Sequence, residues 1–247
     1  MMLANIRNIL LIVNPGQIDS FKSLLGDGSK YGIKINYKIQ LKPRGLPDAF
    51  NLGKSFIGSD NVALILGDNF FYGQSLAQKL EKSAKHKTGA TIFLKEVTEP
   101  ENYGVAKIKK NKIQKIVEKP KKFISRNAIT GLYFFDKNVS KYSGKLKPSK
   151  RGELEITSVN QFYLSQNNLK VELLGRGFAW LDTGTHDSLL EAGQFIESIE
   201  KRKGLKVACL EEIAFRMGYI SSEQVKKLAQ PLKKNDYGKY LLNLIQK

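Results

Sequence analysis

Residues 62–69 have the sequence Val-Ala-Leu-Ile-Leu-Gly-Asp-Asn, in which an unbroken apolar run ends in a glycine and an acid. An apolar run of strand length without polar alternation is typical of a parallel strand that is covered on both faces. An acid directly after such a strand lies at the edge where open α/β sheets bind ligands, so Asp68 is a candidate Mg²⁺ ligand. The alternative is an ordinary turn formed by Asp68 and Asn69.

The segments around this strand alternate between short apolar runs and amphipathic stretches. Before Gly104 the pattern predicts strands at 8–13, 33–40 and 90–97, helices near 17–25 and 75–84, and a helix that starts at 45–48. After Gly104 it predicts a hairpin of 105–109 and 112–117 around Lys110 and Asn111, a strand at 128–135, a helix at 188–203 and a helical tail at 205–247. No linker rich in Pro, Gly or Ser divides the chain. We therefore expect one α/β domain over residues 1–247, with a mixed, mostly parallel sheet flanked by helices.

The start of the chain is unusual for such a domain. Residues 1–7 resemble the end of a helix and lead straight into the strand at 8–13. A parallel α/β sheet normally begins with a strand and its phosphate-facing loop. We therefore expect the first strand and loop of the domain to be missing from this sequence.

Composition limits the class of protein. With 41% hydrophobic and 26% charged residues, the chain has the balance of a folded soluble protein. The single cysteine, Cys209, excludes an intrachain disulfide and fits a reducing cytoplasm. The apolar runs are far shorter than the ~20 residues of a membrane span, and no secretory signal is visible. We expect a cytoplasmic protein without a membrane partner.

The formal net charge of +18 has three explanations. Most of the 41 basic residues are lysines distributed along the chain, which is consistent with a lysine-rich composition and solvated amines. A phosphate-rich small-molecule substrate would also suit a basic protein. Nucleic-acid binders concentrate arginine and interleave aromatic residues on one face, and no such motif is present. We therefore expect no nucleic-acid partner.

A second acid occurs in a similar setting. Residues 177–185 have the sequence Gly-Phe-Ala-Trp-Leu-Asp-Thr-Gly-Thr, in which Asp182 leaves a predicted strand end before a helix. Taken alone, Asp182 would be interpreted as a turn or N-cap residue. Two carboxylates that converge from separate strand ends, however, bind a hard cation through oxygen, the arrangement that suits Mg²⁺ shared with phosphates.

Two further segments carry charged side chains at the ends of predicted elements. Val117-Glu118-Lys119-Pro120 places an acid and a base at a strand end, where lysine could neutralise a phosphate and glutamate could accept sugar hydroxyls. The alternative is an exposed ion pair between Glu118 and Lys119. Residues 151–157, Arg-Gly-Glu-Leu-Glu-Ile-Thr, look like a basic loop that enters a helix.

Together these segments resemble the bacterial sugar-nucleotide pyrophosphorylases, and within them the glucose-1-phosphate thymidylyltransferases. The resemblance covers nearly the whole chain in order, and its most specific part is the run from Gly175 to His186. The other matching segments are residues 24–28, 62–69, 118–120, 130–133 and 151–157.

The resemblance implies a function and a set of site residues. It implies Mg²⁺-dependent formation of dTDP-glucose and pyrophosphate from dTTP and glucose-1-phosphate, on a nucleotide-diphospho-sugar transferase-like fold. Mg²⁺ would be held by Asp68 and Asp182, and Lys119 would position the attacking phosphate. The nucleobase would meet Gln40 and Gly45. The implied contacts of the sugar phosphate are Asn69, Gly104, Glu118, Lys119 and Ile129. A regulatory nucleotide site at subunit contacts of a homotetramer would include Tyr72, Gly73, Arg176, Glu212 and Ile213.

The same resemblance identifies a missing segment. Family members begin with a strand and a Gly-x-Gly-Thr-Arg loop that holds the triphosphate, and roughly forty leading residues are absent here by comparison. Three hypotheses follow: a fragment or mis-called start of an active transferase, a non-catalytic paralogue that binds nucleotide or sugar nucleotide, or a nucleic-acid protein. For the chain as written we expect weak or no activity.

Overall fold

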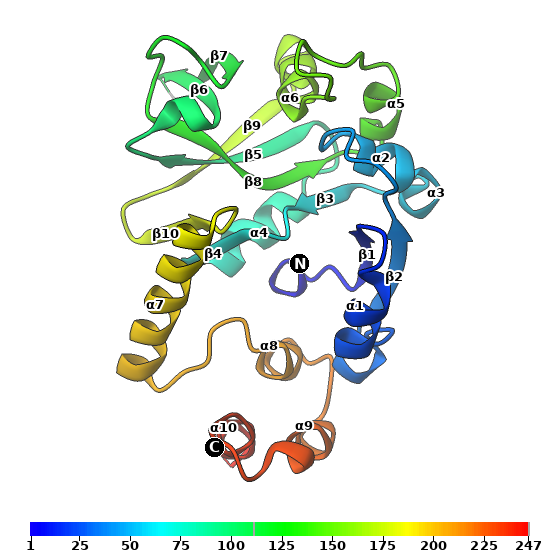
Figure 1. Cartoon of the computed structure of the whole chain (residues 1–247), viewed down its shortest axis with the longest axis vertical. Helices are drawn as coiled ribbons and strands as arrows, with labels where there is room; N and C mark the ends of the chain where they lie inside the picture. Colours follow the sequence, from blue (N-terminus) through cyan, green and yellow to red (C-terminus); the bar gives the residue numbers. More distant parts are fainter. Residues whose placement is uncertain (111, 247) are drawn as a thin grey trace. The chain divides into compact units, whose positions relative to one another are not determined.

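The computed structural model describes residues 1–110 and 112–246; Asn111, in the predicted hairpin turn, and Lys247 lie outside them. The chain forms two compact units (Figure 1). The central unit is Lys42–Ser188, and the terminal unit combines Met1–Leu41 with Leu189–Lys247. Each unit is described by itself below, and the expected single domain over 1–247 stays a prediction.

A six-stranded sheet forms the central unit, in the order β7-β6-β8-β5-β9 with β3 also paired to β8. Its strands are β3 (Val62–Ile65), β5 (Ala90–Glu96), β6 (Gly104–Lys109), β7 (Lys112–Glu118), β8 (Asn127–Phe135) and β9 (Leu169–Leu174). Because β5 follows one edge of β8, β3 and β6 share the other edge. The predicted hairpin is confirmed as β6 and β7, which pair antiparallel from Gly104 opposite Glu118.

The mixed α/β sheet is confirmed, but the proportion of parallel pairs is smaller than expected. Strand β8 runs antiparallel to β3, β5 and β6, and within this sheet the described parallel pair is β5 with β9. The expectation that 62–66 forms a parallel strand covered on both faces is therefore corrected: β3 pairs antiparallel with β8, and Ile65 is 37% exposed. An apolar run indicates that a strand is buried but does not indicate its direction, which is why the sequence pattern predicted the wrong direction for this strand.

A two-stranded ribbon continues from the sheet and carries the candidate acids. Strand β4 (Asn69–Gly73) pairs antiparallel with β10 (Phe178–Asp182). The ladder places Asp182 opposite Asn69 at one end and Phe178 opposite Gly73 at the other. The predicted strand-end acids thus come to the same end of one ribbon.

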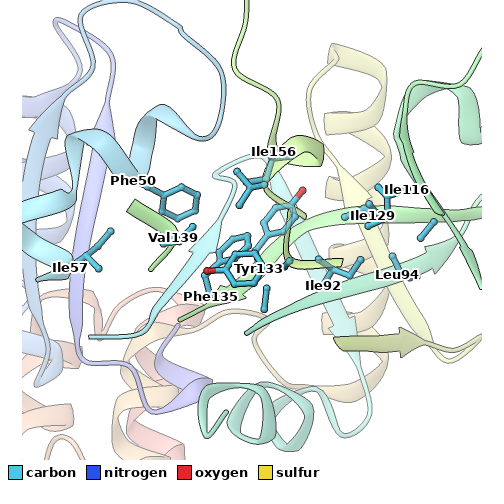
Figure 2. Close-up of a cluster of buried hydrophobic side chains, with 14 residues drawn as sticks. Phe50, Ile57, Ile92, Leu94, Ile116, Ile129, Tyr133, Phe135, Val139 and Ile156 are labelled. Atoms are coloured by element: carbon cyan, nitrogen blue, oxygen red, sulfur yellow. The ribbon is translucent and has the colours of Figure 1, made fainter. Parts of the chain in front are cut away.

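Helices cover both faces of the sheet in the central unit (Figure 1). They are α2 (Asp48–Leu52), α3 (Lys54–Ile57), α4 (Leu76–Ala84), α5 (Val139–Ser143) and α6 (Ile156–Ser165), with the short η3 (Pro100–Asn102). One face of the sheet and α2, α3, α5 and α6 share a buried cluster that includes Phe50, Ile92, Tyr133, Phe135 and Val139 (Figure 2). The rings of Phe50 and Phe135 meet edge to face with centroids 5.3 Å apart. Truncating such a buried phenylalanine to alanine costs about 3–5 kcal/mol, so this cluster anchors the strands that carry the site.

The terminal unit contains a parallel pair of strands and most of the chain's C-terminal helices. Strands β1 (Asn8–Val13) and β2 (Lys34–Ile39) pair parallel, in register from Asn8 opposite Lys34. Around them lie η1 (Met2–Ala4), α1 (Ile18–Leu25), η2 (Ser29–Tyr31), α8 (Leu210–Arg216), α9 (Ser222–Ala229), η4 (Gln230–Leu232) and α10 (Asp236–Leu244). The helix α7 (His186–Lys203) begins in the central unit and continues in this one. Cys209, Val225, Ala229 and Leu241 are buried together, which confirms the predicted helical tail.

Among the residues that the structure describes, no helix has both the length and the apolar character needed to cross a bilayer.

Candidate functional site

Asp68 and Asp182 lie side by side at one end of the β4–β10 ribbon. Asp68 directly precedes β4, and Asp182 is the last residue of β10, opposite Asn69. The backbone N–H and the hydroxyl of Thr183 both donate to the carbonyl oxygen of Asp68, at 2.8 and 2.9 Å. These bonds fasten the two chain segments together just beyond the ladder, so the sequence expectation that the two acids converge agrees with the structure.

One oxygen of each carboxylate lies near Gly184, which has no side chain. A Cβ added to Gly184 would lie 3.1 Å from Asp182 Oδ1 and 4.0 Å from Asp68 Oδ2, so one point with no side chain faces both acids. Within residues 1–110 and 112–246 no group of three or more His, Cys, Asp or Glu gathers as a metal cluster, so the protein's contribution here is two carboxylates. Mg²⁺ is typically held by one or two carboxylates together with substrate phosphates and waters, and this donor set fits it.

The charges around Asp182 also favour a cation beside it. Burial, and then the neighbouring Asp68 carboxylate, raise the pKa of Asp182, while the Gly184 N–H and the positive charge of Lys119 oppose that shift. A cation beside Asp182 would favour its ionised form. Lys119 supplies the nearby positive charge from the protein.

Asn69 connects Asp68 to the neighbouring strands. Its Nδ2 donates to Asp68 Oδ1 at 2.8 Å, and its Oδ1 accepts from the Gly131 N–H at 3.0 Å and from Trp180 Nε1 at 2.7 Å. The Trp180 ring in turn packs against Tyr103, with centroids 5.1 Å apart. Burial, then the charges of Asp182 and Glu99, raise the pKa of the Tyr103 hydroxyl.

Three of the predicted sugar-phosphate residues surround one point. A Cβ on Gly104 would lie 3.0 Å from Thr157 Oγ1, 3.2 Å from Glu118 Oε2 and 3.6 Å from Ile129 Cδ1, so these side chains pack closely against the Gly104 backbone. The Glu118 carboxylate accepts a hydrogen bond from Thr157 Oγ1 and forms an ion pair with Arg151 at 3.4 Å. Among the described residues, Glu118 therefore forms its ion pair with Arg151. The alternative interpretation expected an ion pair with the adjacent Lys119.

Lys119 sits at the junction of this group with the acids. It follows β7 with a φ of 39°, in the left-handed region that non-glycine residues rarely adopt, and its N–H donates to the carbonyl of Tyr103 at 3.0 Å. Lys119 is exposed, and its charge acts to lower the pKa of Asp182. An exposed ammonium at this point could meet a phosphate group shared between the acids and the Glu118 region.

The remaining predicted residues fall in both units. Gly45 is in the central unit, with a φ of 97° and a close approach to the Leu154 backbone, whereas Gln40 follows β2 in the terminal unit. The regulatory candidates divide in the same way: Tyr72, Gly73 and Arg176 lie on or next to the β4–β10 ribbon, and Glu212 and Ile213 lie on α8. Tyr72, Gly73 and Arg176 thus lie near one another at the ribbon. That they form one site with Glu212 and Ile213 stays a prediction.

Sequence reasoning missed three side chains of the site: Tyr103, Thr157 as a partner of Glu118, and Trp180 as a donor to Asn69. The signal available for Trp180 was its spacing, two residues before Asp182 and thus on the same face of the strand.

Comparisons with known proteins show the family of the chain. A family model described as nucleotidyl transferase matches residues 1–199. The glucose-1-phosphate thymidylyltransferase of Neisseria meningitidis is 51% identical over 248 residues, which covers 100% of this chain and 86% of the relative. The enzyme of that name from Mycobacterium tuberculosis is 47% identical over the same shares of the two chains.

Solved structures show the same likeness. A Bacillus anthracis protein assigned as a glucose-1-phosphate thymidylyltransferase, solved with sucrose, has a TM-score of 0.71 and 38% identity, covering 78% of this chain and 77% of its own. A UDP-glucose pyrophosphorylase bound to UDP-glucose has a TM-score of 0.68 at 19% identity, covering 82% of this chain and 84% of its own. The second likeness shows a shared fold alone.

Proposed function

Since the chain belongs to the nucleotidyl transferase family and its relatives at about half identity are glucose-1-phosphate thymidylyltransferases, we propose that it transfers a thymidylyl group from dTTP to glucose-1-phosphate with Mg²⁺ bound between Asp68 and Asp182. The single observation that carries the proposal is that Asp68 and Asp182 come together at one end of the β4–β10 ribbon. The products are dTDP-glucose and pyrophosphate.

The reaction needs alignment more than proton transfer. An oxygen of the glucose-1-phosphate phosphate attacks the α-phosphorus of dTTP, a new P–O bond forms, and the bond from the α-phosphorus to the bridging oxygen breaks to release pyrophosphate. A phosphate monoester is already a nucleophile at neutral pH, so no general base is required. Positioning and charge neutralisation therefore supply the rate enhancement.

The residues divide this work between them. Gly104, Glu118 and Ile129 surround the position for the hexose, where Glu118 accepts sugar hydroxyl protons in hydrogen bonds. Lys119 neutralises the attacking phosphate and keeps it near the acids. A bound Mg²⁺ would stabilise charge on the phosphate oxygens of dTTP. Asp68 and Asp182 are the residues that would hold it.

Other parts of the proposal follow from the resemblance. Gln40 and Gly45 would meet the nucleobase. Tyr72, Gly73, Arg176, Glu212 and Ile213 would form a regulatory nucleotide site at contacts within a homotetramer. The compartment proposed for this sugar-nucleotide synthesis is the cytoplasm.

We further propose that a protein made of residues 1–247 alone turns over slowly. The printed sequence contains no Gly-x-Gly-Thr-Arg segment, whose backbone N–H groups and cation would meet the β- and γ-phosphates. Removing even one such donor costs about a hundredfold or more in rate. The second candidate is a non-catalytic paralogue that binds nucleotide or sugar nucleotide.

Two measurements on the 247-residue chain separate the candidates. Phosphorus NMR follows dTDP-glucose and pyrophosphate from dTTP, glucose-1-phosphate and Mg²⁺ over hours, and calorimetry measures dTDP-glucose binding. Slow turnover that Asp68→Asn and Asp182→Asn each abolish supports the transferase. Binding without any turnover supports the binder, and neither binding nor turnover contradicts both.

A further inference from the structure

The Asn69 side chain occupies a diagonal position on the β4–β10 ladder. Trp180 lies opposite Phe71 in the register, and Asn69 is two residues along β4 on the same face. Diagonal neighbours on one face of an antiparallel pair are within reach of a large aromatic side chain. This is why the Trp180 indole meets the Asn69 amide, with 2.7 Å between Nε1 and Oδ1.

The partners of Asn69 fix which way its amide points. Oδ1 faces the Gly131 N–H and the Trp180 indole N–H, and both of these groups only donate. The other amide atom is therefore Nδ2, and it faces Asp68 Oδ1, which as part of an ionised carboxylate only accepts. If the amide were flipped, its NH₂ group would face two donors and its oxygen would face the Asp68 oxygen, an acceptor. Only one orientation of the Asn69 amide therefore satisfies these partners.

This orientation has a consequence for the two oxygens of Asp68. Oδ1 is held by Asn69 at 2.8 Å, and Oδ2 is the oxygen that faces the point shared with Asp182. Asp68 is exposed, so without a partner its carboxylate would rotate among several orientations. Holding one oxygen directs the other toward the space between the acids.

We propose that Trp180 and Asn69 are positioning residues that aim the Asp68 carboxylate at the divalent cation, with Trp180 acting through the Asn69 amide. The inference rests on the proposed function, because it takes Asp68 as a metal ligand. Residues that hydrogen-bond a metal ligand typically change metal affinity by 10–100-fold when they are replaced. Gly131 continues to orient the amide when the indole donor is lost, so we expect the lower end of that range for Trp180.

Binding of Mn²⁺ alone, as a stand-in for Mg²⁺, tests the proposal without turnover. Free Mn²⁺ is measured by electron paramagnetic resonance in titrations of the 247-residue chain. Trp180→Phe keeps an aromatic ring beside Tyr103 but removes the N–H donor, and should raise the Kd about tenfold. Phe178→Leu is the matched control, because residue 178 lies on the same face of β10 and has no side-chain bond to Asn69. It should leave the Kd within about twofold, well below the range of a lost ligand partner.

The metal ligands themselves separate this inference from the proposed function. Asp68→Asn and Asp182→Asn should each abolish the measured binding. If both bind Mn²⁺ like the unaltered chain, the proposed metal site is wrong and the inference fails with it. If they lose binding while Trp180→Phe stays within twofold, the positioning role alone is overturned.

A second measurement does not depend on the stability of Trp180→Phe. Trp180 is the single tryptophan of the chain, so its indole N–H gives one assignable resonance in a proton–nitrogen spectrum. Asp68→Asn, which alters the far end of the hydrogen-bonded chain, should shift that resonance, and Mn²⁺ should broaden it in the unaltered protein. An indole resonance that neither change affects would contradict the proposal.

Discussion

The amide oxygen of Asn69 lies 2.5 Å from the position that a Cβ on Gly131 would take. Real Cβ atoms do not approach an oxygen so closely, and the Gly131 N–H also donates to that oxygen at 3.0 Å. Strand β8 can therefore hold the Asp68–Asn69 turn only because residue 131 has no side chain.

Gly131→Ala should expel the Asn69 side chain and destabilise the central unit by about 1–3 kcal/mol, the usual cost of overpacking. Dye-monitored or calorimetric unfolding measures the change. Gly193→Ala is the control, since Gly193 is in helix α7 with nothing within 4 Å of its Cβ, and there alanine should be neutral or slightly stabilising. Equal effects of the two substitutions would contradict the close contact.

Thr157→Val should weaken sugar-nucleotide binding. The change preserves shape but removes the hydroxyl that donates to Glu118, and a hydrogen bond to a charged group contributes about 1.5–3 kcal/mol, which is an upper bound on the loss in binding free energy. Calorimetry with dTDP-glucose measures the loss, and Thr157→Ser, which keeps the donor, should restore most of it. Equal affinities for the valine and serine variants would show that the hydroxyl does not orient Glu118.

Lys107→Glu should stabilise the hairpin. Lys107 lies directly opposite Lys115 in the β6–β7 register, and both are exposed. Like charges directly opposite are unfavourable and opposite charges favourable, each by roughly 0.2–1 kcal/mol. Denaturant unfolding at low salt should show the gain, Lys107→Gln should give part of it, and added salt should shrink it. A loss of stability in Lys107→Glu would contradict the register.

Stability should fall as the pH drops below about 6.5, in part because of His86. Burial, then Lys170 and Lys82, lower the pKa of His86 in the folded state, and its Nδ1 lies 3.0 Å from Thr91 Oγ1. The unfolded chain therefore binds a proton more readily than the folded protein between the two pKa values. This contribution is fully present above the unfolded pKa and is lost as the pH falls through the folded one.

Replacing His86 should flatten the stability profile between pH 7.5 and 5. Urea unfolding of His86→Gln, compared with the exposed-residue control His186→Gln, measures the difference in slope. If the free energy of unfolding changed with pH equally in the parent chain and in His86→Gln, His86 would not contribute to the loss of stability at low pH.

The sequence was sufficient for the parts of the site that depend on strand ends. Asp68 and Asp182 each stand at the end of a recognisable apolar run, so both could be identified as strand-end acids, although the pairing that brings them together is the antiparallel β4–β10 ladder and not the expected parallel sheet. The hairpin of β6 and β7 and the helical tail also follow from local periodicity. These features depend on residues near one another in sequence.

The features that escaped prediction depend on contacts between distant segments. The direction of β3 is set by its pairing with β8, seventy residues away along the chain. The contact expected between Asn69 and substrate stays a prediction, and the bonds of its amide to Asp68, Gly131 and Trp180 are specified by no single sequence pattern. The division into two units, with Gln40 in one and Gly45 in the other, likewise depends on packing that a linear pattern does not record.

Anomalous diffraction from crystals of the chain soaked in Mn²⁺ tests the central claim most directly. The account predicts one strong peak with an oxygen of Asp68 and an oxygen of Asp182 each about 2.1 Å away, the distance typical of octahedral sites for small divalent cations. A well-ordered site with no peak between these carboxylates, or a peak bound elsewhere while both remain unliganded, would contradict it.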